Sequence, residues 1–227
     1  MLSGPARLLL IPGLAVLLVA AVALGLSMGT IRLDWSTIGH DDTAATALLQ
    51  LRLPRVLLAV LIGAVLAQTG AVAQALFRNP LAEPGLIGVS AGAALAAAVV
   101  HTALTGIASL AILPPSLLLP IAAFGGGLAA ATLVLRLARR DGHTDMTTML
   151  LAGTAINAFV AAIVGLLSAR ADDSGLRGFT LWMYGNLGRA GWSEIAIAAP
   201  VLLAVALWLP REARGLDALL LGDTEAQ

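Results

Sequence analysis

The run Arg78-Asn79-Pro80-Leu81-Ala82-Glu83-Pro84-Gly85, followed by Gly88-Val89-Ser90-Ala91-Gly92, decides how this chain must fold. It follows about twenty mostly apolar residues that begin after Arg52-Leu53-Pro54-Arg55, so it interrupts what starts as a membrane span. Its two prolines and three glycines break a helical pattern. A simple anchor helix has no use for such a turn, whereas a membrane protein that bends its backbone around a passage does.

Composition sets the class of protein. Apolar residues make up 59% of the chain and charged residues only 11%, with a mean hydropathy of +0.94. A soluble domain carries roughly 25% charged residues, and the apolar residues here fall in blocks of about twenty, enough to cross a bilayer. Because lipid offers no hydrogen-bond partners, such blocks must be helical. The sequence therefore predicts an all-α, polytopic membrane helix bundle surrounded by membrane lipid.

Missing residue types exclude several kinds of chemistry. The chain has no cysteine, which rules out a disulfide framework and a thiolate metal site. All 13 basic residues are arginine, so the lysine of a Walker A phosphate loop or of a Schiff base is missing too. If the protein uses ATP, another chain hydrolyses it. We predict no catalytic residue, no metal site, no cofactor and no nucleic-acid partner.

About six apolar segments are long enough to span the membrane. We interpret the first as a retained span, since it is long for a signal peptide and a cleavage site is missing. Small residues, including Gly125-Gly126-Gly127, predict close packing between helices. The arginines are divided too evenly between the two sides to orient the chain. The predicted spans are residues 8–27, 54–77, 89–112, 117–137, 148–167 and 195–209.

The histidines and the residues in the middle of the spans help to distinguish between haem ligation, ion-coupled transport and a scaffold role. Only His101 of the three histidines (His40, His101, His143) falls inside a predicted span. We interpret it as a hydrogen-bonded histidine between helices, or as a sign that the span ends earlier than predicted, with an axial haem ligand as the alternative. No carboxylate lies mid-span, which counts against an ion-coupled secondary transporter, the alternative of another class. A scaffold without transport activity would gain nothing from the interrupted helices.

Four stretches resemble the permease subunits of type II ABC importers, the family that takes up cobalamin, haem and iron–siderophore chelates. The longest runs from Gln74 to Gly92 and includes the turn described above. The others are Arg52-Leu53-Pro54-Arg55, Leu150-Leu151-Ala152-Gly153, and Leu-Asp-Ala-Leu-Leu-Leu-Gly-Asp at residues 216–223. The resemblance covers the whole chain. Such permeases usually have ten spans, so we expect a C-terminally truncated chain.

The resemblance implies an organisation and a set of partners. Residues 1–227 would be the N-terminal part of one transmembrane permease domain, with 212–227 as a cytoplasmic coupling segment. The chain would work as a homodimer in the bacterial inner membrane, with ATP-binding subunits and a periplasmic substrate-binding protein. Residues 151–158 and 171–177 resemble the haem-importing branch more than the cobalamin branch. We expect haem or another iron chelate as cargo, with cobalamin and ferric siderophores as alternatives.

Arg52 and Arg55 stand at a predicted helix mouth, which the resemblance places on the periplasmic face. Two guanidiniums can hold carboxylates bidentately and fix their orientation. In the family, arginines at these positions pair with glutamates of the binding protein, so we expect docking here. The alternative is a pair of snorkelling arginines that anchor the helix end.

Polar residues within the spans are candidates for the translocation path. Buried amides and hydroxyls in lipid must find partners or line a cavity, and the alternative role is hydrogen bonding between helices. Two threonines at the start of the fifth span match the family's inner gate region. The predicted path residues are Gln68, Thr69, Gln74, Asn157, Thr147 and Thr148.

The tail carries the predicted contact with the ATP-binding subunit. Its leucine spacing favours a short amphipathic helix over a disordered end, and its carboxylates could meet basic residues of that subunit. The alternative is a charged face in solvent. The predicted coupling residues are Leu216, Leu219, Leu220, Gly222, Asp223 and Glu225.

Overall fold

The computed structural model describes residues 4–29, 42–103, 115–140, 143–213 and 215. Five of its helices are long and apolar enough to cross a membrane, and a shorter apolar helix covers Val89–Thr102. The expected all-α, polytopic membrane bundle is confirmed. The chain divides into two compact units, residues 1–68 with 187–211 and residues 69–186 with 212–227.

The first unit contains α1 (Gly4–Ser27), α2 (Asp42–Thr46), the π-helical turn η1 (Ala47–Arg52) and the start of α3 (Leu53–Leu76). The 3-10 turn η4 (Leu187–Arg189) and α8 (Trp192–Trp208) complete it, followed by the turn η5 (Leu209–Glu212). The predicted second span, from about Pro54, agrees with the start of α3 at Leu53, although the apolar helical stretch extends back through η1 and α2 to Thr43. Proline lacks an N–H, and the π-helical turn just before it rearranges the hydrogen-bond ladder at that point.

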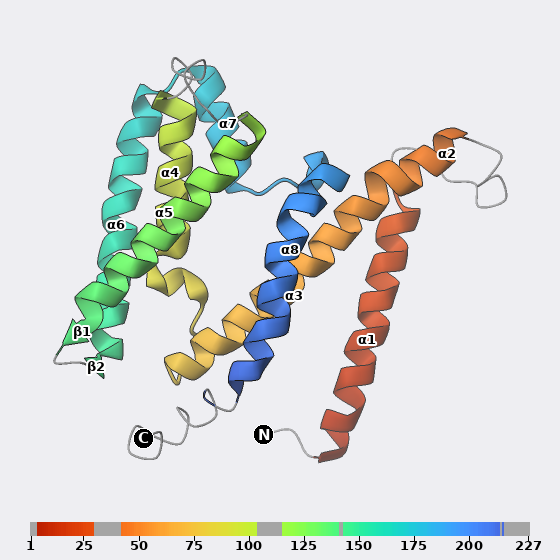
Figure 1. Cartoon of the computed structure of the whole chain (residues 1–227), viewed down its shortest axis with the longest axis horizontal. Helices are drawn as coiled ribbons and strands as arrows, with labels where there is room; N and C mark the ends of the chain where they lie inside the picture. The colour runs from red at the N-terminus through yellow and green to blue at the C-terminus, as the bar shows by residue number, and fades with distance from the viewer. Residues whose placement is uncertain (1–3, 30–41, 104–114, 141–142, 214, 216–227) are drawn as a thin grey trace. The chain divides into compact units, whose positions relative to one another are not determined.

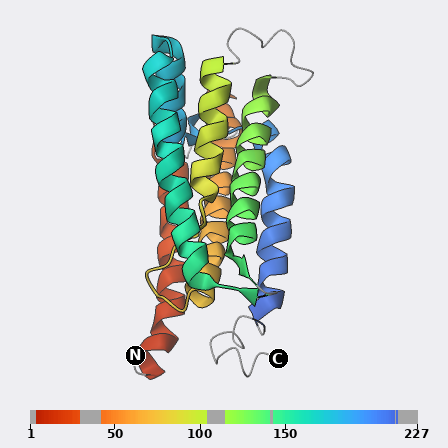
Figure 2. The ribbon, with the colours of Figure 1, turned by 90° about the vertical axis from the view of Figure 1, so that its left-hand side faces the viewer.

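The second unit contains the end of α3, the 3-10 turn η2 (Pro84–Ile87), α4 (Val89–Ala103), α5 (Pro115–Ala138), α6 (Met146–Arg170) and α7 (Asp173–Met183). Helices α4, α5 and α6 lie side by side along much of their length (Figures 1 and 2). Two-residue strands, β1 (Arg139–Arg140) and β2 (His143–Thr144), pair antiparallel between α5 and α6. The rest of the predicted third span, residues 104–112, lies outside the described residues.

Two aspartates set the starts of helices in this unit. Asp145 caps α6, where its side chain accepts hydrogen bonds from the Thr147 and Thr148 N–H groups. Asp172 caps α7 by accepting from the Gly175 N–H at 3.1 Å. The Asp172 cap starts the helix at Asp173, because it satisfies a backbone donor that would otherwise have no partner.

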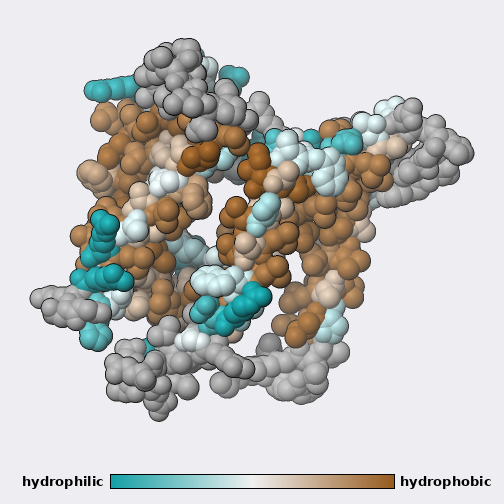
Figure 3. Space-filling model, in the orientation of Figure 1, coloured by the Kyte–Doolittle hydropathy of each residue, from teal (hydrophilic) through white to brown (hydrophobic). Residues whose placement is uncertain are grey.

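Packing is concentrated in two apolar clusters of the second unit. Val134, Ala138 and Met149 form one cluster, and Ala97, Ala98 and Phe179 form the other. Elsewhere the helices present apolar side chains outward, as the brown surface over them in Figure 3 shows. An apolar exterior on long helices is what a bilayer solvates.

Candidate functional site

The segment between α3 and α4, residues 77–88, is called here the α3–α4 turn. Asn79 organises its first half: its side-chain Oδ1 accepts from the Leu81 N–H at 2.9 Å and its backbone oxygen from the Ala82 N–H at 3.0 Å. Arg78 has a positive φ of 49°, and Gly88 ends η2 with a φ of 81°. Such φ values favour glycine, which explains Gly88 at the point where the chain enters α4.

The α3–α4 turn lies against α6. The Asn157 side chain donates its Nδ2–H to the Gly85 carbonyl oxygen at 3.2 Å. One turn earlier on α6, Gly153 is buried under the Leu86 carbonyl, so close that an added Cβ would collide with that oxygen. Ile87 and Phe77 pack on the Val134–Met149 cluster. A loop between two helices is thereby held by backbone and side-chain contacts with a third.

The start of α6 adds a polar group beside the predicted inner gate. Thr148 donates its hydroxyl to an Asp145 carboxylate oxygen, which also accepts from the Thr148 N–H at 3.3 Å. Thr147 is exposed. Our sequence reasoning missed Asp145, although an aspartate just before an apolar helical run is a recognised helix start.

The remaining predicted path residues lie on α3. Gln68 is the last residue of the first unit, whereas Thr69 and Gln74 belong to the second unit together with Asn157. The Gln68 Oε1 atom is buried without a hydrogen-bond partner among the described residues, and Gln74 is exposed. Lining of a passage by these residues stays a prediction.

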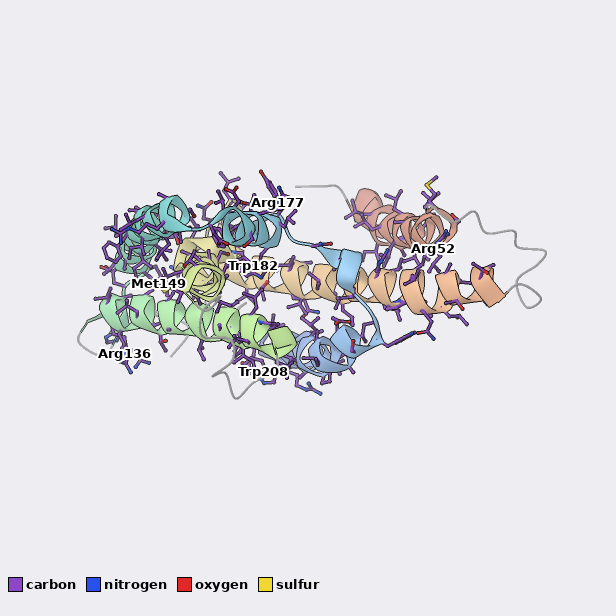
Figure 4. The ribbon with its side chains drawn as sticks, turned by 90° about the horizontal axis from the view of Figure 1, so that it is seen from above. Arg52, Arg136, Met149, Arg177, Trp182 and Trp208 are labelled. Atoms are coloured by element: carbon purple, nitrogen blue, oxygen red, sulfur yellow. The ribbon has the colours of Figure 1, made fainter. Side chains whose placement is uncertain are left out.

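The two arginines of the first unit hold backbone carbonyl groups. Arg52 is only 7% exposed, and its Nη1 donates to the Leu26 and Ser27 oxygens, both at 2.8 Å (Figure 4). These carbonyls end α1, where helical partners run out and the helix dipole is negative. A Cβ on Gly29 would lie 2.7 Å from the guanidinium, so glycine leaves it room.

Arg55 makes a longer-range connection. Its Nη2 donates to the Gly188 oxygen in η4 at 2.6 Å. A second bond joins the same two segments, since the Trp192 Nε1, four residues after Gly188, donates to the Leu49 oxygen at 3.0 Å. These two bonds fasten the start of α3 to the turn that leads into α8. Both guanidiniums therefore hold backbone oxygens in this conformation. Docking of a binding protein on them stays a prediction.

Replacing Arg52 with glutamine should destabilise the protein. The Leu26 and Ser27 carbonyls would lose their donor, and an unsatisfied buried acceptor costs about 1–3 kcal/mol. We expect the thermal unfolding temperature in detergent to fall by about 2–10 °C. Arg177→Gln is the matched control, since Arg177 is exposed on α7 and should leave it unchanged. Equal unfolding temperatures for the two variants would show that Arg52 does not hold α1.

His101 lies in the last turn of α4, and its ring contacts α7. Its ring meets Phe179 edge-on at 6.5 Å, and Phe179 stacks on Trp182 at 6.3 Å. The His101 Nε2 atom is buried without a hydrogen-bond partner among the described residues. The ring therefore lies against a second helix, as interpreted, but the expected hydrogen bond is missing at Nε2 among the described residues. At the start of α7, hydrogen bonds from the Ser174 hydroxyl and then the Gly175 N–H lower the pKa of the Asp172 carboxyl.

Some predicted residues cannot be placed. The whole coupling set (Leu216, Leu219, Leu220, Gly222, Asp223 and Glu225) and His40 lie outside the described residues. Among the described residues, no group of three or more histidines and carboxylates could hold a metal ion.

Comparison with known proteins places the chain. The FecCD transport family model matches residues 17–227. The chain belongs to the FecCD transport family. It is 41% identical to the hemin transport system permease protein HmuU of Yersinia pestis, over 99% of this chain and 67% of that protein. It is 37% identical to the vitamin B12 import system permease protein BtuC of Citrobacter koseri, over 94% of this chain and 62% of that protein.

A solved structure supports the same family relationship. An inward-facing conformation of a metal-chelate type ABC transporter matches with a TM-score of 0.81 and 26% identity, over 96% of this chain and 66% of that one. The resemblance to type II importer permeases is thereby confirmed, and the chain is a multi-pass membrane protein of the permease type. It spans between about half and two thirds of the length of the curated relatives it matches.

Proposed function

We propose that this FecCD-family chain is the membrane-spanning subunit, or the larger part of one, of an ATP-driven importer for haem or another iron chelate. The observation that carries the proposal is the 41% identity to a hemin permease, which extends over 99% of this chain. The matches named as cobalamin or vitamin B12 permeases are 35–37% identical and cover less of the chain. Cobalamin is therefore the second candidate cargo, and a ferric siderophore the third.

The partners follow from the same proposal. A second copy of the permease, ATP-binding subunits and a periplasmic substrate-binding protein would complete the importer in the bacterial inner membrane. The binding protein would dock at Arg52 and Arg55, and the ATP-binding subunit would hold the segment from Leu216 to Glu225. ATP hydrolysis would belong to that subunit, since this chain has no lysine for a phosphate loop.

The α3–α4 turn suggests how movement would reach the passage. Because Gly153 and Asn157 fix the turn to α6, the turn and α6 should move together when helices tilt as rigid bodies. The polar residues at the start of α6, Thr147 and Thr148, would move with them. In this proposal the passage opens and shuts by such tilting, and the permease performs no covalent chemistry.

The experiment that tests the cargo measures ATP hydrolysis by the full-length complex in lipid vesicles. We expect hydrolysis to rise when haem-loaded binding protein is added outside, and to stay at its basal rate with empty binding protein. Stimulation by a cobalamin-loaded protein and not by a haem-loaded one would replace haem with cobalamin. Uptake driven by a proton gradient without ATP would overturn the importer class altogether.

A further inference from the structure

The end of α5 carries two exposed arginines. Arg136 lies in the last turn of α5 and Arg139 opens strand β1, three residues later. Both are exposed, and neither guanidinium has a hydrogen-bond or ion-pair partner among the described residues. Figure 3 shows hydrophilic side chains gathered around this end of the helix, next to an apolar surface.

The backbone under these arginines is firmly held. Ala138 and Val134 are fully buried in the cluster with Met149. The Asp145 N–H donates to the Ala138 oxygen at 3.0 Å, and Arg139 pairs with Thr144 across the hairpin. Packing and backbone hydrogen bonds therefore fix the backbone positions of both arginines.

Asp145, the first described carboxylate after these arginines in the sequence, is already hydrogen-bonded. Asp145 uses its side chain to cap α6, where it accepts from the Thr147 N–H at 3.1 Å and from Thr148. A carboxylate bound to a helix N-terminus is satisfied where it is. Asp141, between the arginines and Asp145 in sequence, lies outside the described residues.

The same face of α5 continues as apolar surface. Leu133 and Leu137 are 49% and 55% exposed, and residues three and four apart share one face of a helix, which groups both leucines with Arg136. Cationic groups at the end of an exposed apolar stripe match an amphiphile with an anionic head. Guanidinium groups bind phosphate oxygens in a bidentate manner.

We propose that the end of α5, through Arg136 and Arg139, binds the phosphate headgroup of an anionic glycerophospholipid, whose acyl chain lies along Leu133 and Leu137. Charge complementarity favours a phospholipid with net negative charge, such as phosphatidylglycerol, over zwitterionic phosphatidylcholine. The binding is independent of the cargo and of ATP hydrolysis, so it goes beyond the proposed function.

The test is native mass spectrometry of the full chain in detergent, titrated with phosphatidylglycerol or with phosphatidylcholine. We expect retained adducts with phosphatidylglycerol at concentrations that give none with phosphatidylcholine. The double variant Arg136→Gln/Arg139→Gln should bind phosphatidylglycerol about tenfold more weakly or worse, and Arg136→Lys/Arg139→Lys should recover part of the binding because it keeps both charges. Circular dichroism of each variant checks that it is folded.

The control is Arg170→Gln/Arg177→Gln, which removes the same charge from exposed arginines at the far end of α6 and on α7. It should retain wild-type binding. The proposal is overturned if both double variants lose binding equally, or if phosphatidylcholine binds as well. It is also overturned if inorganic phosphate displaces the adduct at equal concentration, or if the α5 variant weakens only association with an ATP-binding subunit.

Discussion

Alanine in place of Gly153 should displace the α3–α4 turn from α6 and destabilise the protein. A Cβ at this position would collide with the Leu86 carbonyl oxygen and would lie 3.4 Å from the Ile87 Cα. The atoms it meets are backbone atoms, which cannot rotate away as a flexible side chain would. The turn must therefore shift, and the Asn157 bond to the Gly85 oxygen is broken with it.

The relative size of two opposing free-energy terms decides whether Gly153→Ala destabilises the protein. Overpacking a tight contact costs about 1–3 kcal/mol, and more where backbone must move, while alanine gains up to about 1 kcal/mol in helix propensity over glycine. The clash outweighs the propensity gain. We expect the thermal unfolding temperature to fall by several degrees, at about 2–4 °C per kcal/mol for a chain of this size.

A matched control lies on the same helix. Gly165 has no atom within 4 Å of an added Cβ, so Gly165→Ala should raise the unfolding temperature slightly or leave it unchanged. Thermal unfolding in detergent, followed by circular dichroism, compares the two variants. If Gly153→Ala has the same unfolding temperature as the wild type, α6 does not hold the turn. The proposed coupled movement of the turn and α6 would then be rejected as well.

The sequence was sufficient for the fold class and for the approximate bounds of most of the described membrane helices, because about twenty consecutive apolar residues have few other uses. It also placed the α3–α4 turn, since proline and glycine act locally on the backbone. It could not show that the turn rests on α6. That contact joins segments far apart in the chain, and a glycine at a close approach has the same local pattern as a glycine in open space.

Arg52 illustrates the same limit for a charged residue. Arginine at a helix mouth is usually exposed, and the pattern Arg-Leu-Pro-Arg alone favours a surface role. Its burial depends on where the end of α1 lies, which is set by tertiary packing. Asp145 and Asp172 are different, because helix capping is local and an aspartate before a helical segment could have been recognised from the sequence.

Alanine at Gly126 should separate α4 from α5. A Cβ there would collide with the Gly92 backbone oxygen and lie 2.7 Å from the Ala96 Cβ. A Cβ on Gly92 would likewise collide with the Gly126 oxygen, so the two glycines allow backbones to touch directly. Close backbone approach is how helices gain packing energy in lipid, where the hydrophobic effect between them is lost.

The expected loss is about 3 kcal/mol or more, since two helices must move apart along their contact and Ala97 and Ala98 nearby are fully buried. The neighbouring residue provides the control. Gly125 has no atom within 4 Å of an added Cβ, so Gly125→Ala keeps the same composition and nearly the same position without the clash. Thermal unfolding in detergent should fall well below wild type for Gly126→Ala and stay level for Gly125→Ala. Equal behaviour of the two would mean that α4 and α5 do not touch at Gly92, and the order of the helices in this unit would need revision.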